Sequence, residues 1–189
     1  MKIPVGISGR HAHISQEHLE ILFGKGYELT EFKALSQPGQ YAAEEKIDVV
    51  SPTGQVIAGV RILGPVRPST QIELSLSDAR RARINAPVRS SGNIAGSAAA
   101  KIVGPKGEVE LPEGVIIADR HIHFSLEDAA KFGVTDKEVV SIKVGGIKPG
   151  VLGNVLCRVS DQFVLDCHLD TDDGSAFMLN NGDLVELIK

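Results

Sequence analysis

The chain has 189 residues, of which 20 are basic and 24 acidic, so its formal net charge is −4 at pH 7. Its 42% hydrophobic and 23% charged residues are typical of a globular protein and exclude a disordered or fibrous chain. A mildly acidic chain without Trp, and with only 2 Tyr and 6 Phe, offers little for a phosphate backbone or for stacked bases, so we expect no nucleic-acid partner.

The predicted elements are short. Residues 1–7 form a strand-like run with no signal peptide or lipidation motif, and no later run has the roughly 20 apolar residues that cross a bilayer, so we expect no membrane partner. Apolar spacing predicts a helix over Gln16–Phe23 that Gly24 ends. Hairpins are predicted over Ile47–Ile57 and Ile102–Leu111, because each has a Pro and Gly turn between alternating residues.

The chain also repeats itself. Arg10–Ser15 returns as Arg120–Ser125, an offset of 121 − 11 = 110 residues. Ser75–Ala79 returns as Ser125–Ala129, and Asp172–Ala176 is a looser copy; each opens on a side chain that can cap a short helix. Repeated short strands, tight turns and brief helices predict a mainly β fold of two small, pseudo-duplicated β-barrels with capping helices.

Each repeat contains a His-x-His pair, His11 with His13 and His121 with His123. Residues i and i+2 of a strand face the same side, so each pair presents two imidazoles together, an arrangement that suits Zn²⁺. The alternative is that duplication has left exposed histidines at two strand ends.

Each pair needs a third ligand. His168 follows a strand-like run, and Glu73 holds the matching place before the Ser75 helix; between Ile72 and Leu74 its buried charge would need a partner. Two groups of three ligands with one open coordination position each indicate catalytic metal. His18, on the polar side of the first helix, is expected to be a solvated surface residue.

Several other side chains could bind an anion or act as a nucleophile. Arg67 lies in a turn shortly before Glu73 and could grip phosphate, although a plain surface arginine is the alternative. The turn containing Ser91 offers hydroxyls and free N–H groups. The two cysteines, Cys157 and Cys167, are expected to be buried core residues of a protein from a reducing cytosol.

Four kinds of segment together resemble one known family. The two histidine motifs, Leu35–Gln40, Arg67–Glu73 and Val164–Asp170 are similar to the PduL-type phosphotransacylases, or phosphate propanoyltransferases, and the likeness covers essentially the whole chain. It implies a discontinuous barrel of residues 1–10 plus 119–189, a helical connecting segment of residues 11–36, and a central barrel of residues 37–118.

The resemblance also implies residue roles. His11, His13 and Glu73 would hold one Zn²⁺, and His121, His123 and His168 a second. Arg67 would be the catalytic residue that binds phosphate, with Ser91 beside it. The coenzyme A pocket would be lined by Ser8, Lys33, Arg61 and Leu63, whereas Ser175 stands where the family pattern has Asn.

The implied reaction interconverts a short-chain acyl-CoA, propanoyl or acetyl, and inorganic phosphate with an acyl phosphate and coenzyme A, as in propanediol degradation. We expect direct transfer without an acyl-cysteine, because metal and Arg67 suffice to activate the reactants. The alternatives are a zinc hydrolase of acyl phosphates or thioesters, and a barrel that only binds metal. The resemblance further implies a homodimer, and, since no encapsulation helix precedes the first strand, a cytoplasmic protein.

Overall fold

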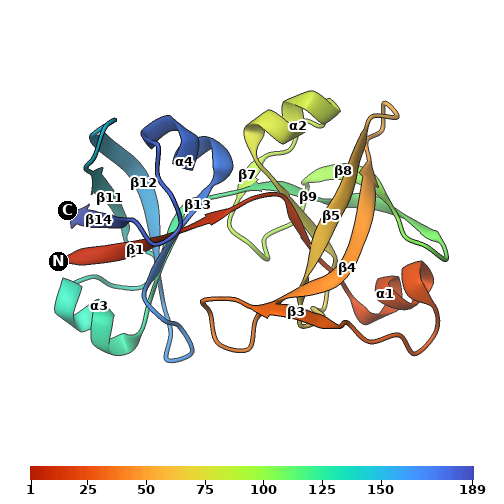
Figure 1. Cartoon of the computed structure of the whole chain (residues 1–189), viewed down its shortest axis with the longest axis horizontal. Helices are drawn as coiled ribbons and strands as arrows, with labels where there is room; N and C mark the ends of the chain where they lie inside the picture. Colours follow the sequence, from red (N-terminus) through yellow and green to blue (C-terminus); the bar gives the residue numbers. More distant parts are fainter. The chain divides into compact units, whose positions relative to one another are not determined.

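The computed structural model describes all 189 residues, which divide into two compact units (Figure 1). The first unit consists of Met1–Gly9, Ser36–Pro38 and Asp119–Lys189, and the second of Arg10–Leu35 and Gly39–Ala118. Nearly all of residues 11–36, which the resemblance treats as a connection, therefore belong to the second unit. Only the short segment Ser36–Pro38 packs with the first.

Six strands close the barrel of the first unit in the order β1-β13-β10-β12-β11-β14. Their bounds are β1 (Lys2–Ser8), β10 (His121–Phe124), β11 (Val139–Val144), β12 (Gly150–Val159), β13 (Asp166–Asp170) and β14 (Leu184–Ile188). Two short helices, α3 (Leu126–Phe132) and α4 (Thr171–Phe177), follow β10 and β13.

The strand pairings of the second unit also close a ring of six, in the order β2-β5-β4-β8-β9-β6. The bounds in this unit are β2 (His11–His13), β3 (Glu31–Ala34), β4 (Tyr41–Val50), β5 (Val56–Gly64), β6 (Gln71–Leu74), β7 (Val88–Arg89), β8 (Ala98–Val103) and β9 (Glu108–Ala118). Strands β3 and β7 pair outside the ring, with β4 and β9. The helices are α1 (Gln16–Phe23) and α2 (Leu76–Ala82).

The two rings have the same topology. Strand β10 runs parallel to β12 and antiparallel to β13, as β2 does to β5 and β6. In the same way β13 runs parallel to β1, as β6 does to β9. The mainly β fold of two duplicated barrels with short helices is confirmed, as are the helix over Gln16–Phe23 and both hairpins.

The duplication also shows which helices correspond. Helices α1 and α3 each follow a histidine-pair strand, and α2 and α4 each follow the strand paired antiparallel with it. The likeness between Ser75–Ala79 and Ser125–Ala129 therefore reflects a shared way of starting a helix and not an equivalent place in the barrel. Each of the four cap residues accepts a hydrogen bond from the backbone N–H three residues on, which satisfies one free donor of the first turn. The cap residues are Ser15, Ser75, Ser125 and Asp170.

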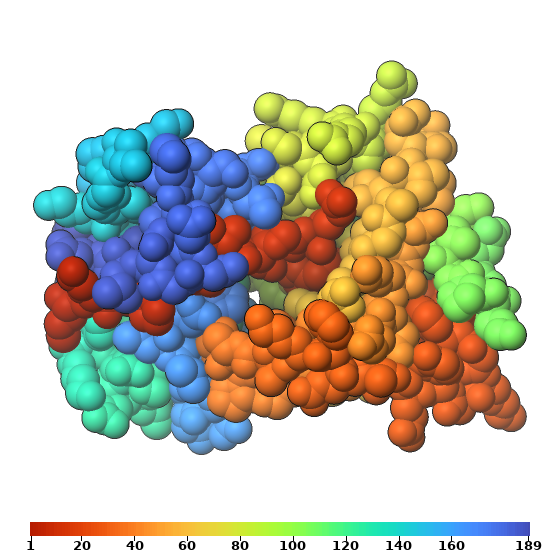
Figure 2. Space-filling model, in the orientation of Figure 1, coloured from red at the N-terminus to blue at the C-terminus, as the bar shows by residue number.

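Each barrel has its own hydrophobic core. In the second unit, Leu19 and Leu22 of α1 are fully buried in that core, and the N–H of Lys106 donates to the carbonyl of Leu22 at 2.9 Å. Figure 2 shows the green turn around residue 106 lying against the orange-red helix. None of the four helices is long and apolar enough to cross a membrane. The helices instead fix the ends of the strands that carry the candidate site.

Candidate metal centres

The first candidate centre, here the His/Glu group, consists of His11 and His13 on β2 and Glu73 on β6. Antiparallel pairing places His11 directly opposite Glu73. The Nε2 atoms of His11 and His13 lie 3.3 and 3.6 Å from the two carboxylate oxygens of Glu73, and all three residues are buried. Three ligand atoms within 4.8 Å of one another can hold a single cation.

A hydrogen-bonded network fixes the carboxylate of the His/Glu group. Gln71 and Ser91 donate to Oε1 of Glu73 at 2.6 and 2.9 Å, and Gln71 also donates to Ser91 at 2.9 Å. Arg67 donates to the hydroxyl of Ser91 at 3.2 Å. The structure therefore brings together Arg67, from the loop before β6, and Ser91, from the loop after β7, beside the carboxylate of Glu73. Arg67 is only partly exposed.

The His/Glu group favours a charged carboxylate beside neutral imidazole. Burial opposes ionisation of Glu73, but the neighbouring His11 and His13 outweigh it and hold the pKa of Glu73 well below its usual range. Burial lowers the pKa of His13 and outweighs the hydrogen bond to Glu73 that would raise it. An ionised carboxylate and a neutral imidazole are the forms that bind metal.

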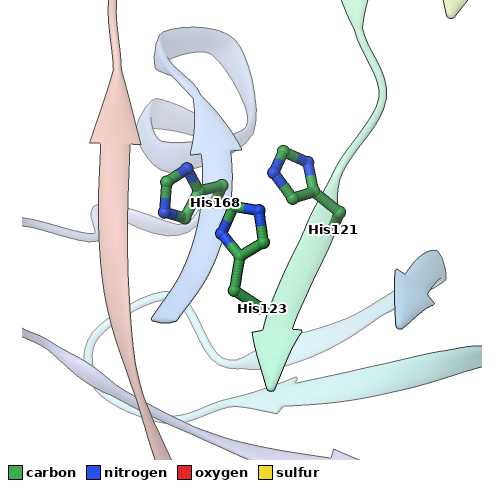
Figure 3. A group of neighbouring side chains, drawn as sticks. All are labelled: His121, His123 and His168. Carbon is green, nitrogen blue, oxygen red and sulfur yellow. The ribbon is translucent and has the colours of Figure 1, made fainter. Parts of the chain in front are cut away.

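The second candidate centre, here the His group, consists of His121 and His123 on β10 and His168 on β13 (Figure 3). His121 lies directly opposite His168 in the antiparallel pair. The ring centroids of His121 and His123 lie 5.0 and 4.7 Å from that of His168, and the three rings gather in one place. Nδ1 of His121 lies 2.9 Å from the carbonyl oxygen of Asp119, which orients this ring.

Both groups contain buried nitrogen atoms that the protein leaves unpaired. Nδ1 of His13, Nδ1 of His123 and Nε2 of His168 are buried without a hydrogen-bond partner. Burial and the neighbouring His121 and His168 lower the pKa of His123 to about 2, so this ring is neutral and keeps a lone pair. A buried, unpaired lone pair is costly, and a bound cation would satisfy it.

The arginine that precedes each histidine pair has the same role in both barrels. Nη1 of Arg10 lies 3.0 Å from Oδ1 of Asp78, and Nε of Arg120 lies 3.1 Å from Oδ2 of Asp173. Both aspartates lie in the first turn of the helix that follows the third-ligand strand. Each ion pair therefore ties the start of a histidine-pair strand to the element that follows the third ligand.

The residues expected to bind coenzyme A lie in both units. Lys33 on β3 pairs with Ala42, which pairs in turn with Leu63 on β5. Arg61, also on β5, lies directly beside His11, and its guanidinium stands 4.7 Å from the centre of the exposed Phe32 ring. Ser8 ends strand β1 of the first unit. Ser175 is exposed in α4.

One expectation about histidine is wrong. His18 is half-buried rather than a solvated surface residue, and its Nδ1 lies 2.8 Å from the hydroxyl of Thr70. Helical spacing placed it on the polar side of α1, but the N–H of Ser15 also donates to Thr70, so this threonine joins the helix start to β6. The contact with Thr70, 52 residues further along the chain, could not be read from helical spacing alone.

Both cysteines are free and buried, as expected. Burial raises the pKa of Cys157 to about 11 and that of Cys167 to about 12. Thiols that stay protonated at neutral pH are poor nucleophiles. The two side chains act as small core residues of the first barrel.

Sequence reasoning missed two residues next to the third ligands. Gln71 and Asp166 precede Glu73 and His168 by two positions and pair with His13 and His123 in the two barrels. The i, i+2 spacing that revealed the histidine pairs also applies here, since Gln71 shares a strand face with Glu73 and Asp166 with His168. Both missed residues are buried and polar.

The fold and the two groups define a class: a duplicated two-barrel protein with a candidate three-ligand metal centre in each barrel. A family model described as phosphate propanoyltransferase matches residues 4–180. A phosphate propanoyltransferase of Thermotoga maritima is 50% identical over 188 residues, covering 99% of this chain and 89% of the relative. The chain belongs to the phosphate propanoyltransferase family.

Other relatives agree. The phosphate propanoyltransferase of Lachnoclostridium phytofermentans is 47% identical over 186 residues, covering 98% of this chain and 87% of the relative. The phosphate propanoyltransferase of Clostridioides difficile is 45% identical over 187 residues, covering 99% of this chain and 89% of the relative. The predicted family is confirmed over essentially the whole chain.

Proposed function

We propose that the chain is a zinc-dependent phosphate acyltransferase, which interconverts a short-chain acyl-CoA and inorganic phosphate with an acyl phosphate and coenzyme A. Family membership supports the reaction class. The observation that carries the metal dependence is the pair of three-ligand groups at equivalent places in two duplicated barrels.

The donor sets suit zinc. Imidazole and carboxylate are ligands that Zn²⁺ takes at both structural and catalytic sites, and three protein ligands leave a position for a reactant. The buried, unpaired nitrogens of His13 and His123 are groups that a cation would satisfy. When bound, the metal would supply Lewis-acid polarisation and charge neutralisation for phosphate, carbonyl or thiolate.

Arg67 and Ser91 are proposed to bind inorganic phosphate. Arg67 is joined through Ser91 to the carboxylate of Glu73, so both side chains are positioned beside the His/Glu group. A guanidinium can donate two hydrogen bonds to phosphate, which holds and orients the attacking oxygen. The side chain also offsets the negative charge that two anionic reactants bring together.

Coenzyme A carries several phosphates, and Lys33 and Arg61 on neighbouring strands are proposed to bind them together with Leu63. In the reaction a phosphate oxygen attacks the thioester carbonyl, the carbon–sulfur bond breaks, and coenzyme A leaves as a thiolate that takes up a proton. The high pKa values of Cys157 and Cys167 support direct transfer without an acyl-cysteine.

The test is an assay of coenzyme A release with a free-thiol reagent, using protein of measured zinc content, acetyl- and propanoyl-CoA, and buffers with and without phosphate. We expect release that requires phosphate and rises with zinc to two ions per chain. Release at the same rate without phosphate would instead establish a hydrolase. No release from fully zinc-loaded protein would contradict the proposal. The homodimer that the resemblance implies is tested separately, by light scattering.

A further inference from the structure

The polar residue two positions before the third ligand differs between the barrels in a compensating way. The His/Glu group has a carboxylate ligand, Glu73, preceded by the neutral Gln71. The His group has a neutral third residue, His168, preceded by the carboxylate Asp166. Each barrel therefore places one carboxylate beside its two paired histidines. The two carboxylates stand two positions apart on corresponding strands, Glu73 at the third-ligand position of β6 and Asp166 two positions before it on β13.

Asp166 lies in direct reach of the His group. Its Oδ2 stands 3.2 Å from Nε2 of His168, and the residue is 6% exposed. Strand β1 passes close beside it: Gly6 pairs with His168, and a Cβ atom at position 6 would lie 3.1 Å from Oδ2 of Asp166. The absence of a side chain at position 6 leaves room for the carboxylate.

The segment Ser36–Pro38, which returns to the first unit, holds Asp166 in place. Ser36 donates to Oδ2 of Asp166 at 2.5 Å. The buried side chain of Gln37 donates to the carbonyl of Val164 at 2.9 Å and accepts from its N–H at 3.2 Å. This explains the motif around Ser36 and Gln37, to which the proposed reaction assigns no role.

We propose that Asp166 is a positioning residue for metal binding by the His group. This inference rests on the proposed function, because the His group must hold a cation. A carboxylate beside a metal-binding imidazole orients the ring and strengthens its binding of the metal. Here Oδ2 of Asp166 lies 3.2 Å from Nε2 of His168, which has no hydrogen-bond partner within the protein. The buried negative charge also offsets a dication among three neutral imidazoles, as Glu73 does in the other barrel.

The test is a titration of metal-free protein with Zn²⁺ in competition with a chromophoric chelator, followed by the visible spectrum of the Co²⁺-loaded protein. We expect Asp166→Asn to weaken the binding of one of two ions by about 10- to 100-fold, the usual effect of losing such a partner. The Co²⁺ bands of that ion alone should change. Asp161→Asn, at an exposed position of the same segment, should leave both ions and the spectrum as in the wild type.

His121→Ala identifies which ion is affected, because in that background Asp166→Asn should have no further effect on the remaining ion. Two ions bound by Asp166→Asn with wild-type affinity and spectrum would overturn the inference and leave the proposed function standing. A wild-type protein that binds no Zn²⁺ would overturn the proposed function itself. Should Asp166→Asn not fold, Ser36→Ala decides: weaker binding of the same ion supports the role, and unchanged binding overturns it.

Discussion

Glu73 in one barrel and His168 in the other occupy the same structural position. Each lies directly opposite the first histidine of its pair, Glu73 opposite His11 and His168 opposite His121. Each also precedes a capped short helix that an arginine–aspartate ion pair ties to the histidine strand. One barrel design therefore presents two candidate ligand sets that differ only in the third donor, a carboxylate or an imidazole.

We expect Glu73→Gln to reduce bound zinc from two ions to one. The amide keeps the shape of the side chain but removes the charged donor. Losing the hydrogen-bonding partner of a metal ligand typically costs roughly 10- to 100-fold in activity, and we expect the loss of a ligand itself to cost more. Metal content by elemental analysis and coenzyme A release check this. Glu108→Gln, at an exposed residue of β9, is the control and should retain both ions. Two ions in Glu73→Gln would remove this residue from the ligand set.

Arg67→Lys should raise the KM for phosphate by about tenfold or more, because hydrogen bonds to charged groups contribute roughly 1.5–3 kcal/mol and an ammonium lacks the paired donors of guanidinium. The KM for acyl-CoA should change much less. Initial rates at varied phosphate measure both constants. Arg81→Lys, exposed on α2, serves as the matched control. An unchanged KM for phosphate would show that Arg67 does not bind it.

The double substitution Cys157→Ala with Cys167→Ala should leave kcat within about threefold of the wild type and lower stability by about 1–3 kcal/mol, as small core truncations do. Since burial raises the two pKa values to about 11 and about 12, neither thiol should react with alkylating reagents at pH 8 unless the protein unfolds. Mass spectrometry after brief labelling tests this. An acyl adduct trapped on either cysteine would contradict direct transfer.

The metal-free protein should lose stability as the pH falls below about 6.5. Burial lowers the pKa of His123 to about 2, so the folded ring stays neutral while the unfolded ring gains a proton. The contribution of His123 to the free energy of unfolding therefore decreases by up to about 1.4 kcal/mol for each pH unit below about pH 6.5. Urea denaturation between pH 7.5 and pH 5 measures the slope. His123→Gln should show a shallower slope; an equal slope would assign the effect to other residues.

Local patterns in the sequence determined the turns, the helix starts and the grouping of the candidate ligand residues. Strand geometry places residues i and i+2 on one face, so each His-x-His pair could be predicted to act together before any fold was known. Cap residues before short helices, and Pro and Gly in turns, are likewise local signals. The repeat then pointed to Glu73 and His168 as matching third residues, and the structure groups both with their pairs.

Only the tertiary structure decided which strands pair and in what register, because pairing depends on contacts between segments far apart in the chain. Ser36 and Asp166 are 130 residues apart, yet they share a 2.5 Å hydrogen bond. Spacing along the chain likewise did not show that the hydroxyl of Thr70 lies 2.8 Å from Nδ1 of His18. Asp166 and Thr70 are buried, and a buried polar group must find its partner wherever the fold supplies one. The sequence therefore determined the candidate ligand types, and the register of the barrels determined what surrounds them.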